Sequence, residues 1–199
     1  MKVKIKKQGK TESFNLINSW SDVTLETWLQ LIDFETGTKT EEATETIAAL
    51  SDIPKKLIKE LSLSDVANIM SKVAELQQKQ DTKLKRIIEI NDIEYGFHPD
   101  LDSISLGEYA DIEQFIKNGI DKNLPSLMAV LYRPVKEKKN DIYIIDAYDG
   151  DIRLRTEEMK QMSAEQVQSA LVFFYTLGKV LSEIMPSYLM ERLKEMKTQ

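Results

Sequence analysis

The sequence predicts an α+β fold that is predominantly helical, and three observations support this prediction. Apolar residues recur at intervals of three and four, as amphipathic helices require. Short stretches with alternating or β-branched residues surround turn-forming residues, as in β-hairpins. The pattern also occurs twice, because residues from about 14 to 54 align without a gap at an offset of 81. We therefore expect an internal duplication of a β-hairpin plus three-helix unit, with an extra hairpin in the second copy.

A hairpin is the first element of each expected copy. The stretch "KVKIKKQGKTESFNL" would turn at Gln8-Gly9, and "LKRIIEINDIEYGF" would turn at Asn91-Asp92. In the first stretch, lysines alternate with Val3 and Ile5. This alternation indicates a strand with one face in water and one face buried, and a phosphate-binding stripe of lysines is the alternative interpretation.

A helix follows each hairpin. Leu25, Trp28 and Leu31 lie three residues apart, which places them on one helix face. At the offset of 81, the aligned pairs are Leu25 with Leu106, Trp28 with Tyr109, Leu31 with Ile112 and Phe34 with Phe115. Further on, "IAALS" (47–51) aligns with "MAVLY" (128–132). We expect the copies to pack across a pseudo-twofold axis, with Trp28 and Tyr109 buried in equivalent places.

The third helix of each copy aligns at a larger offset of 101, where "ELSLSDVANIM" meets "QMSAEQVQSAL". Helix starts are marked by capping boxes at Ser105 with Glu108 and at Ser163 with Gln166, and by the N-cap residues Thr24 and Ser62. We expect Pro54 and Pro134 to interrupt helices at equivalent points. The 20 additional residues of the second copy predict a hairpin from about 136 to 155 that turns at Asp149-Gly150, and "KEKK" (136–139), before "NDIYIIDAY", is interpreted as a polar loop.

The two expected units cover residues 1–82 and 83–199, and each has the size of a small domain. They would pack either as separate domains or as one globule. The second unit would end in a long helix from about Ala164 through Ile184 and a terminal helix after Pro186.

Composition limits the classes of function. The net charge of −6 argues against general affinity for a nucleic-acid backbone. The absence of cysteine excludes disulfides and thiolate nucleophiles, and with His98 as the only histidine it also excludes a His/Cys zinc site. We expect His98 in a turn or at the surface. The longest apolar run, "ALVFFYTL", is too short to span a bilayer, which predicts a soluble protein without a membrane partner.

The acidic residues form no convincing catalytic or metal pattern. Glu108 and Asp111 lie three apart on a predicted helix, as an acid/base pair would, but a solvated helix face is the simpler interpretation. Asp146, Asp149 and Asp151 have the spacing D-x-x-D-G-D, which departs from that of a calcium loop and favours a turn. The glycines form no phosphate-binding loop. We therefore expect no enzyme and no cofactor.

Binding to a partner protein remains as a function. The stretch "ALVFFYTLGKVLSEIMPSYLM" is apolar around much of its circumference, so it is either a central helix or an exposed strip that meets another chain or a second copy. "LYRPV" places an aromatic residue and an arginine together, as interface hot spots often do. The candidate partner-binding residues are Tyr132, Arg133, Phe173, Phe174, Leu181 and Tyr188.

Five stretches resemble a family of small proteins encoded by tailed bacteriophages, including crAss-like phages of gut bacteria. They are "SWSDVTLETWLQL", "LSDIPKKLIKELSLSDVANIM", "LDSISLGEYADIEQFI", "NLPSLMAVLYRPV" and "VQSALVFFYTLGKVL", and the resemblance runs from about Trp20 to Leu181. Proteins of this kind lie among virion structural and assembly genes, and some look like tail assembly chaperones. The resemblance defines no functional residues.

The resemblance implies a non-enzymatic phage assembly protein that binds other virion or tail proteins in the host bacterial cytoplasm, and a tail assembly chaperone is one form of it. The alternative is a virion structural component, such as a ring, connector or packaged cargo subunit, that stays in the mature particle. A third hypothesis is an enzyme or a host-directed nucleic-acid binder, which the acidic charge and the missing catalytic groups disfavour.

Overall fold

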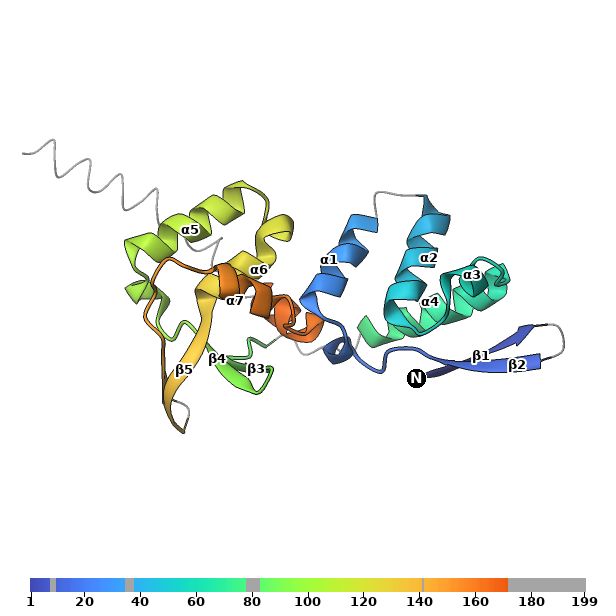
Figure 1. The fold of residues 1–199 in the computed structure, drawn as a ribbon, viewed down its shortest axis with the longest axis horizontal. Helices are drawn as coiled ribbons and strands as arrows, with labels where there is room; N and C mark the ends of the chain where they lie inside the picture. Colours follow the sequence, from blue (N-terminus) through green and yellow to red (C-terminus); the bar gives the residue numbers. More distant parts are fainter. Residues whose placement is uncertain (8–9, 35–37, 78–82, 141, 172–199) are drawn as a thin grey trace, which may run out of the picture.

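The computed structural model describes residues 1–7, 10–34, 38–77, 83–140 and 142–171. These residues form an α+β fold with two antiparallel sheets, as the sequence predicted. The molecule is elongated, and its N-terminal and C-terminal halves lie side by side along the long axis (Figure 1).

The elements follow the same opening order in both halves. The N-terminal half contains β1 (Lys2–Lys7), β2 (Lys10–Asn15), the 3-10 turn η1 (Trp20–Asp22), α1 (Leu25–Phe34), α2 (Lys39–Leu50), α3 (Lys55–Ile58) and α4 (Leu63–Gln77). The C-terminal half contains β3 (Ile87–Ile90), β4 (Ile93–Phe97), η2 (Leu101–Ser103), α5 (Leu106–Lys117), α6 (Ile120–Leu131), β5 (Tyr132–Lys139), β6 (Ile142–Ile145), α7 (Arg153–Met159) and a further helix over residues 164–171.

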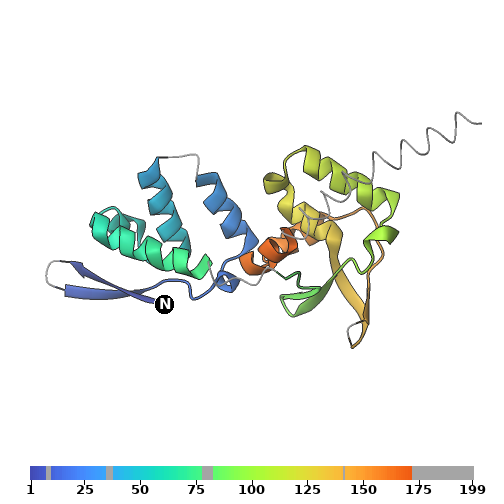
Figure 2. The same ribbon diagram turned by 180° about the vertical axis from the view of Figure 1, so that it is seen from behind.

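The β1–β2 hairpin covers the helices of the N-terminal half. Val3 and Ile5 are buried in the apolar cluster of that half, whereas Lys2 and Lys4 are exposed, so the predicted one-sided strand is confirmed. In both views the hairpin runs alongside α4 (Figure 1, Figure 2). The expected turn at Gln8-Gly9 lies outside the described residues.

The C-terminal half holds a four-stranded sheet in the order β3-β4-β5-β6. The predicted β3–β4 turn at Asn91-Asp92 is confirmed, and both residues have positive φ, 51° and 62°, as a type I′ hairpin turn requires.

The prediction for the extra hairpin was wrong in its limits. It is formed by β5 and β6, so "KEKK" belongs to a strand, and Pro134 lies within β5, because α6 has already ended at Leu131. Asp149-Gly150 follows β6 in a connection, and the residues after it form α7 instead of a strand. The β-rich composition of 142–145 indicated a strand correctly, but its pairing partner precedes it in the sequence.

Equivalent elements keep the offset of 81. α2 and α6 begin and end 81 residues apart, and so do η1 and η2. The Ile17 N–H donates to Leu50 O at 3.0 Å, and 81 residues later the His98 N–H donates to Leu131 O at 2.8 Å. Leu16 pairs with Ser51 as Phe97 pairs with Tyr132. These correspondences support the duplication, which stays a prediction.

The two halves meet where two helices begin. Thr24, before α1, pairs in antiparallel fashion with Ser163, before the helix over 164–171. The Leu25 N–H donates to Met162 O, and the Ala164 N–H donates to Val23 O, both at 2.7 Å. We call this pairing of residues 23–25 with residues 162–164 the N-cap joint.

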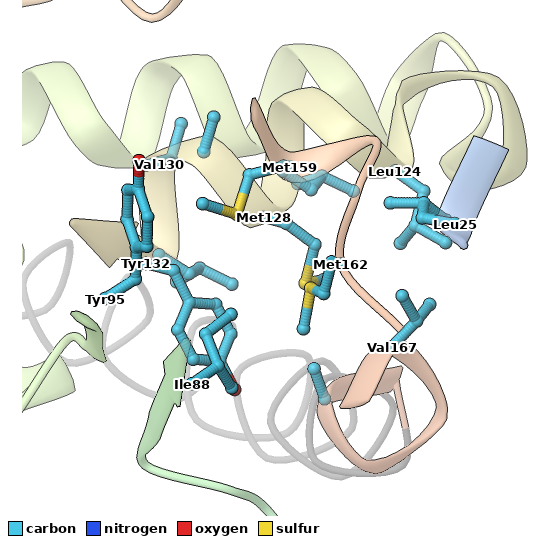
Figure 3. Close-up of a cluster of buried hydrophobic side chains, with 14 of the residues drawn as sticks. Leu25, Ile88, Tyr95, Leu124, Met128, Val130, Tyr132, Met159, Met162 and Val167 are labelled. Carbon is cyan, nitrogen blue, oxygen red and sulfur yellow. The ribbon is translucent and has the colours of Figure 1, made fainter. Parts of the chain in front are cut away.

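Leu25 inserts from the N-terminal half into the apolar core of the C-terminal half (Figure 3). It lies in one cluster with Leu124, Met128, Met162 and Val167. The expected equivalent burial of Trp28 and Tyr109 was wrong, because both are only partly buried and Trp28 packs against both apolar clusters. The joint uses the start of one helix from each half, at positions that do not correspond, so the contact is not twofold.

Candidate functional site

A buried cluster of three polar side chains lies inside the C-terminal half. His98 follows β4, Glu108 is in the first turn of α5, and Arg133 is the second residue of β5. Each is only 4–8% exposed. Arg133 Nη2 lies 2.8 Å from Glu108 Oε1, and His98 Nε2 lies 3.6 Å from the same oxygen. A single carboxylate oxygen of Glu108 therefore faces both the Arg133 guanidinium and the His98 imidazole.

The start of α5 orients this carboxylate. The Glu108 N–H donates to Ser105 Oγ at 3.3 Å, and the Ser105 N–H donates to Glu108 Oε2 at 2.8 Å. This reciprocal capping box was predicted from the S-x-x-E spacing and is confirmed. Because Oε2 is held by the cap, Oε1 is turned towards Arg133 and His98.

The environment shifts the pKa values of the acid and the imidazole in the same direction. Burial acts to raise the pKa of Glu108, but the hydrogen bonds from Ser105 and the charge of Arg133 outweigh it and hold the pKa below its ordinary value. Burial lowers the pKa of His98, although Glu108 partly opposes this. At neutral pH the cluster is therefore a Glu108 carboxylate paired with the Arg133 guanidinium beside a neutral imidazole.

Tyr148 and Arg155 form an outer layer around the cluster. The Tyr148 hydroxyl donates to Asp111 Oδ2, and the Arg133 guanidinium lies 5.8 Å from the centre of the Tyr148 ring. Burial and Asp111 raise the pKa of Tyr148, so the hydroxyl keeps its proton and remains a donor. Arg155 Nε donates to Ala129 O at 2.6 Å. These contacts tie the connection after β6 to α5, and α7 to α6.

The geometry of the cluster indicates a structural role. A general acid or base must come within hydrogen-bonding reach of a substrate. In this structure, Arg133 Nη2 and His98 Nε2 both face Glu108 Oε1, whereas His98 Nδ1 and Arg133 Nε are buried without a hydrogen-bond partner among the described residues. The cluster therefore joins the end of β4, the start of α5 and the start of β5.

Sequence reasoning missed this cluster. His98 was expected in a turn or at the surface and Glu108 on a solvated helix face, and both expectations were wrong because the fold brings Arg133 over the start of α5. The one local signal was an arginine between apolar residues in "LYRPV". Its acidic partner lies 25 positions earlier, and nothing in the spacing links the two.

The candidate partner-binding residues fall into two groups. Tyr132 and Arg133 are buried, so in this structure they present no surface to a partner. The Tyr132 hydroxyl donates to Lys85 O at 2.8 Å, and its ring packs edge-on against Phe97. The others, Phe173, Phe174, Leu181 and Tyr188, lie outside the described residues.

The structure instead exposes apolar residues at the free end of the four-stranded sheet. Ile142 and Ile144 on β6 are 77% and 55% exposed, and Ile93 on β4 is 46% exposed. By strand alternation and pairing, all three lie on the face that also carries Tyr95. Near α6 this face is covered by the core, and towards the β5–β6 turn it is not. We call these three residues the isoleucine strip.

The remaining surface features offer fewer groups that point to a particular ligand or reaction. A shallow groove of ≈ 490 Å³ between β1 and α4 is lined by side chains of both charges, among them Lys4 and Glu75. Asp146 pairs with Lys136 at 2.9 Å, and Asp151 pairs with Arg153 at 3.0 Å. Within the described ranges, no group of three acidic, histidine or cysteine side chains is placed to hold a metal ion.

A search of the described helices found none long and apolar enough to cross a membrane. No family model, curated protein or solved structure matches this chain.

Proposed function

We propose that this protein is a non-enzymatic assembly protein of a tailed bacteriophage and that it works by binding another virion or tail protein. The sequence resemblance supplies the phage context. The isoleucine strip is the observation that favours binding, because clustered apolar side chains on an exposed sheet face mark interaction sites.

The position of β6 suggests how the partner binds. β6 is an edge strand, since the sheet order ends with it. Ile142 and Ile144 point to one face of this edge, and Tyr143 is buried on the other. An extended apolar segment of a partner would add a strand beside β6 and cover the two isoleucines. This mode would keep an aggregation-prone segment of a tail protein paired until assembly, as a chaperone does.

Pairwise co-purification tests this proposal. The full chain is co-expressed with each virion and tail protein of the phage that encodes it, and one of these is expected to co-purify. The double variant Ile142→Asp/Ile144→Asp should lose that partner. Leu154→Asp is the matched control, because Leu154 is 85% exposed and belongs to α7, outside the four-stranded sheet. Failure of every partner to bind, or binding that survives the double change, would contradict the proposal.

The alternative is a component of the mature particle. Quantitative mass spectrometry of purified virions separates the two forms of the proposal. A chaperone is expected in infected cells and absent from virions, whereas a ring, connector or cargo subunit is present in a defined number of copies per particle.

A further inference from the structure

The N-cap joint uses one helix start from each half and leaves the two corresponding helix starts uncovered. At the offset of 81, Leu25 corresponds to Leu106, and at the offset of 101, Ala164 corresponds to Leu63. Leu25 and Ala164 are fully buried in the joint, but Leu106 is 84% exposed and Leu63 is 88% exposed. These two are among the most exposed large apolar side chains of the described residues.

The uncovered segments have the same local structure as the joined ones. Each segment is an apolar residue, a hydroxyl N-cap and the first helical residue: "VTL" (23–25) and "MSA" (162–164) in the joint, "ISL" (104–106) and "LSL" (61–63) outside it. Ser62 Oγ accepts from the Asp65 N–H at 3.1 Å, as Ser163 Oγ accepts from the Gln166 N–H at 3.3 Å. At all four starts, the hydroxyl of the N-cap residue therefore accepts from the N–H three residues further on and caps the first turn.

The segment before Ser62 also matches the segment before Ser163. The Leu61 N–H donates to Ile58 O at 3.1 Å, and 101 residues later the Met162 N–H donates to Met159 O at 3.0 Å. Across the joint, the Glu26 N–H donates to Lys160 O at 3.1 Å. The counterpart of Lys160 is Lys59, and the counterpart of Glu26 is Gly107. The segment that contacts the start of α1, residues 160–164, thus has a counterpart with matching hydrogen bonds in residues 59–63, at the start of α4.

The main-chain groups needed for a second joint are available. In the N-cap joint, the N–H of the first helical residue donates across the contact on both sides. Among the described residues, no main-chain acceptor is paired with the Leu63 N–H or the Leu106 N–H. The first N–H groups of a helix have no partner inside the helix, so at these exposed starts they can exchange water for an acceptor on another chain.

We propose that a second copy of this chain supplies the missing partner: residues 104–106 of one molecule pair with residues 61–63 of the next, in the geometry of the N-cap joint. In this contact, Leu106 of one molecule is buried against the start of α4 of the next, and Leu63 of the next molecule is buried against the start of α5 of the first. The two surfaces differ, so the contact is head-to-tail and continues from molecule to molecule until it closes into a ring or remains an open chain. This inference does not rest on the proposed phage function.

Complementation between two variants tests the proposal. Sedimentation velocity of the full chain over a range of concentrations should show species that grow beyond dimers. Leu63→Glu and Leu106→Glu should each weaken self-association about 10- to 100-fold, since each removes one buried leucine and introduces a charge. An equimolar mixture of the two variants should form dimers and nothing larger, because each variant keeps one intact surface. Leu154→Glu, at a leucine of equal exposure, should behave as the wild type.

Engineered disulfides test the register of the contact. The chain contains no cysteine, so introduced thiols react only with each other. Thr24 and Ser163 form a pair without direct hydrogen bonds, in which Cα atoms lie about 4.5 Å apart, close enough for a disulfide. Thr24→Cys/Ser163→Cys should therefore cross-link within one molecule. A mixture of Ser62→Cys and Ser105→Cys chains should cross-link between molecules.

Three results would overturn the proposal. A wild-type chain that stays monomeric at every concentration would overturn it, and protection of Leu106→Cys from alkylation would then show that the chain covers this surface itself. Self-association that survives in the Leu63→Glu variant but is lost in the Leu106→Glu variant would indicate a twofold contact through Leu106. A mixture of the two glutamate variants that stays monomeric would exclude the head-to-tail pairing. Because both leucines are exposed, circular dichroism should show the variants folded as the wild type. The self-association measurements do not depend on whether a partner binds at Ile142 and Ile144, so either proposal can fail without the other.

Discussion

Replacing Glu108 by glutamine would remove the only negative charge that directly contacts Arg133 in the buried cluster while keeping the shape of the side chain. The amide oxygen of glutamine still accepts the Ser105 N–H, so the capping box survives. Arg133 keeps its burial but loses the carboxylate oxygen that lies 2.8 Å from Nη2. The change therefore isolates the charge interaction from the helix cap.

The expected cost follows from the burial of both partners. The side chains of Glu108 and Arg133 are each 5% exposed, and removing one partner of such a buried pair costs about 3–5 kcal/mol. For a chain of this size, each kcal/mol lowers Tm by about 2–4 °C, so Tm should fall by about 6–20 °C. Glu113→Gln on the same helix is the control. Its pair with Lys117 is at 3.0 Å but has side chains 49% and 70% exposed, so the loss should stay below about 1 kcal/mol.

Urea denaturation followed by circular dichroism measures both costs, and NMR supplies an independent readout. His98 is the only histidine, so its imidazole protons titrate without overlap. Glu108 acts to raise the pKa of His98, and Glu108→Gln should therefore lower this pKa further in the folded protein. A loss of stability no larger than that of Glu113→Gln, or an unchanged pKa of His98, would refute the buried ion pair.

Three further predictions follow from local contacts. Gly96→Ala should destabilise the sheet by about 1–3 kcal/mol, because a Cβ there would lie 2.5 Å from Tyr143 Cε2, and that ring is fixed by its hydroxyl bond to Phe97 O at 2.7 Å. Urea midpoints compared with Gly107→Ala, where the nearest side-chain atom is 3.8 Å away, check it, and equal midpoints would exclude the close packing. Thr38→Ala should cost about 1 kcal/mol in thermal unfolding, since Thr38 caps α2 in a capping box, and no loss would mean that the cap is not formed in solution. The free energy of unfolding should be highest above about pH 6.5 and should fall as pH decreases, because the folded-state pKa of His98 lies below its ordinary 6.5 and the unfolded chain takes up the proton first. The free energy of unfolding should decrease a second time below about pH 4.5, because the pKa of Glu108 is lowered in the folded protein and the unfolded chain takes up this proton first. The variant His98→Gln should remove the first decrease alone.

Local patterns determined the parts of the fold that could be predicted. The S-x-x-E and S-x-x-Q spacings located the starts of α5 and of the helix over 164–171, because a capping box is complete within four residues. The Asn91-Asp92 turn was predicted for the same reason, since both residues tolerate positive φ.

Pairing over longer separations could not be predicted. The extra hairpin was placed too late, because the sequence around Asp149-Gly150 favours a turn and nothing local shows that β5 continues directly from α6. Strand pairing depends on the whole sheet, in which β5 also pairs with β4. The isoleucines of β6 were predicted as strand residues, but their exposure depends on which strand lies beside them.

The candidate site depended on the same long-range information. Arg133 was selected as a surface arginine for a partner, and the structure pairs it with Glu108 in the interior. A charged residue between apolar neighbours has two outcomes, an interface or a buried pair. Only the position of α5 over β5 decides between them.

The N-cap joint also constrains the order in which the chain becomes complete. Val23 to Leu25 emerge early in synthesis, and the segment that covers Leu25 follows only when residues 162–164 have been made. Until then, a leucine that is fully buried in the finished protein lies at the surface of a growing chain. A nascent chain halted between α6 and α7 would carry this uncovered leucine and be prone to aggregate. The last helix of the described structure thus protects the first.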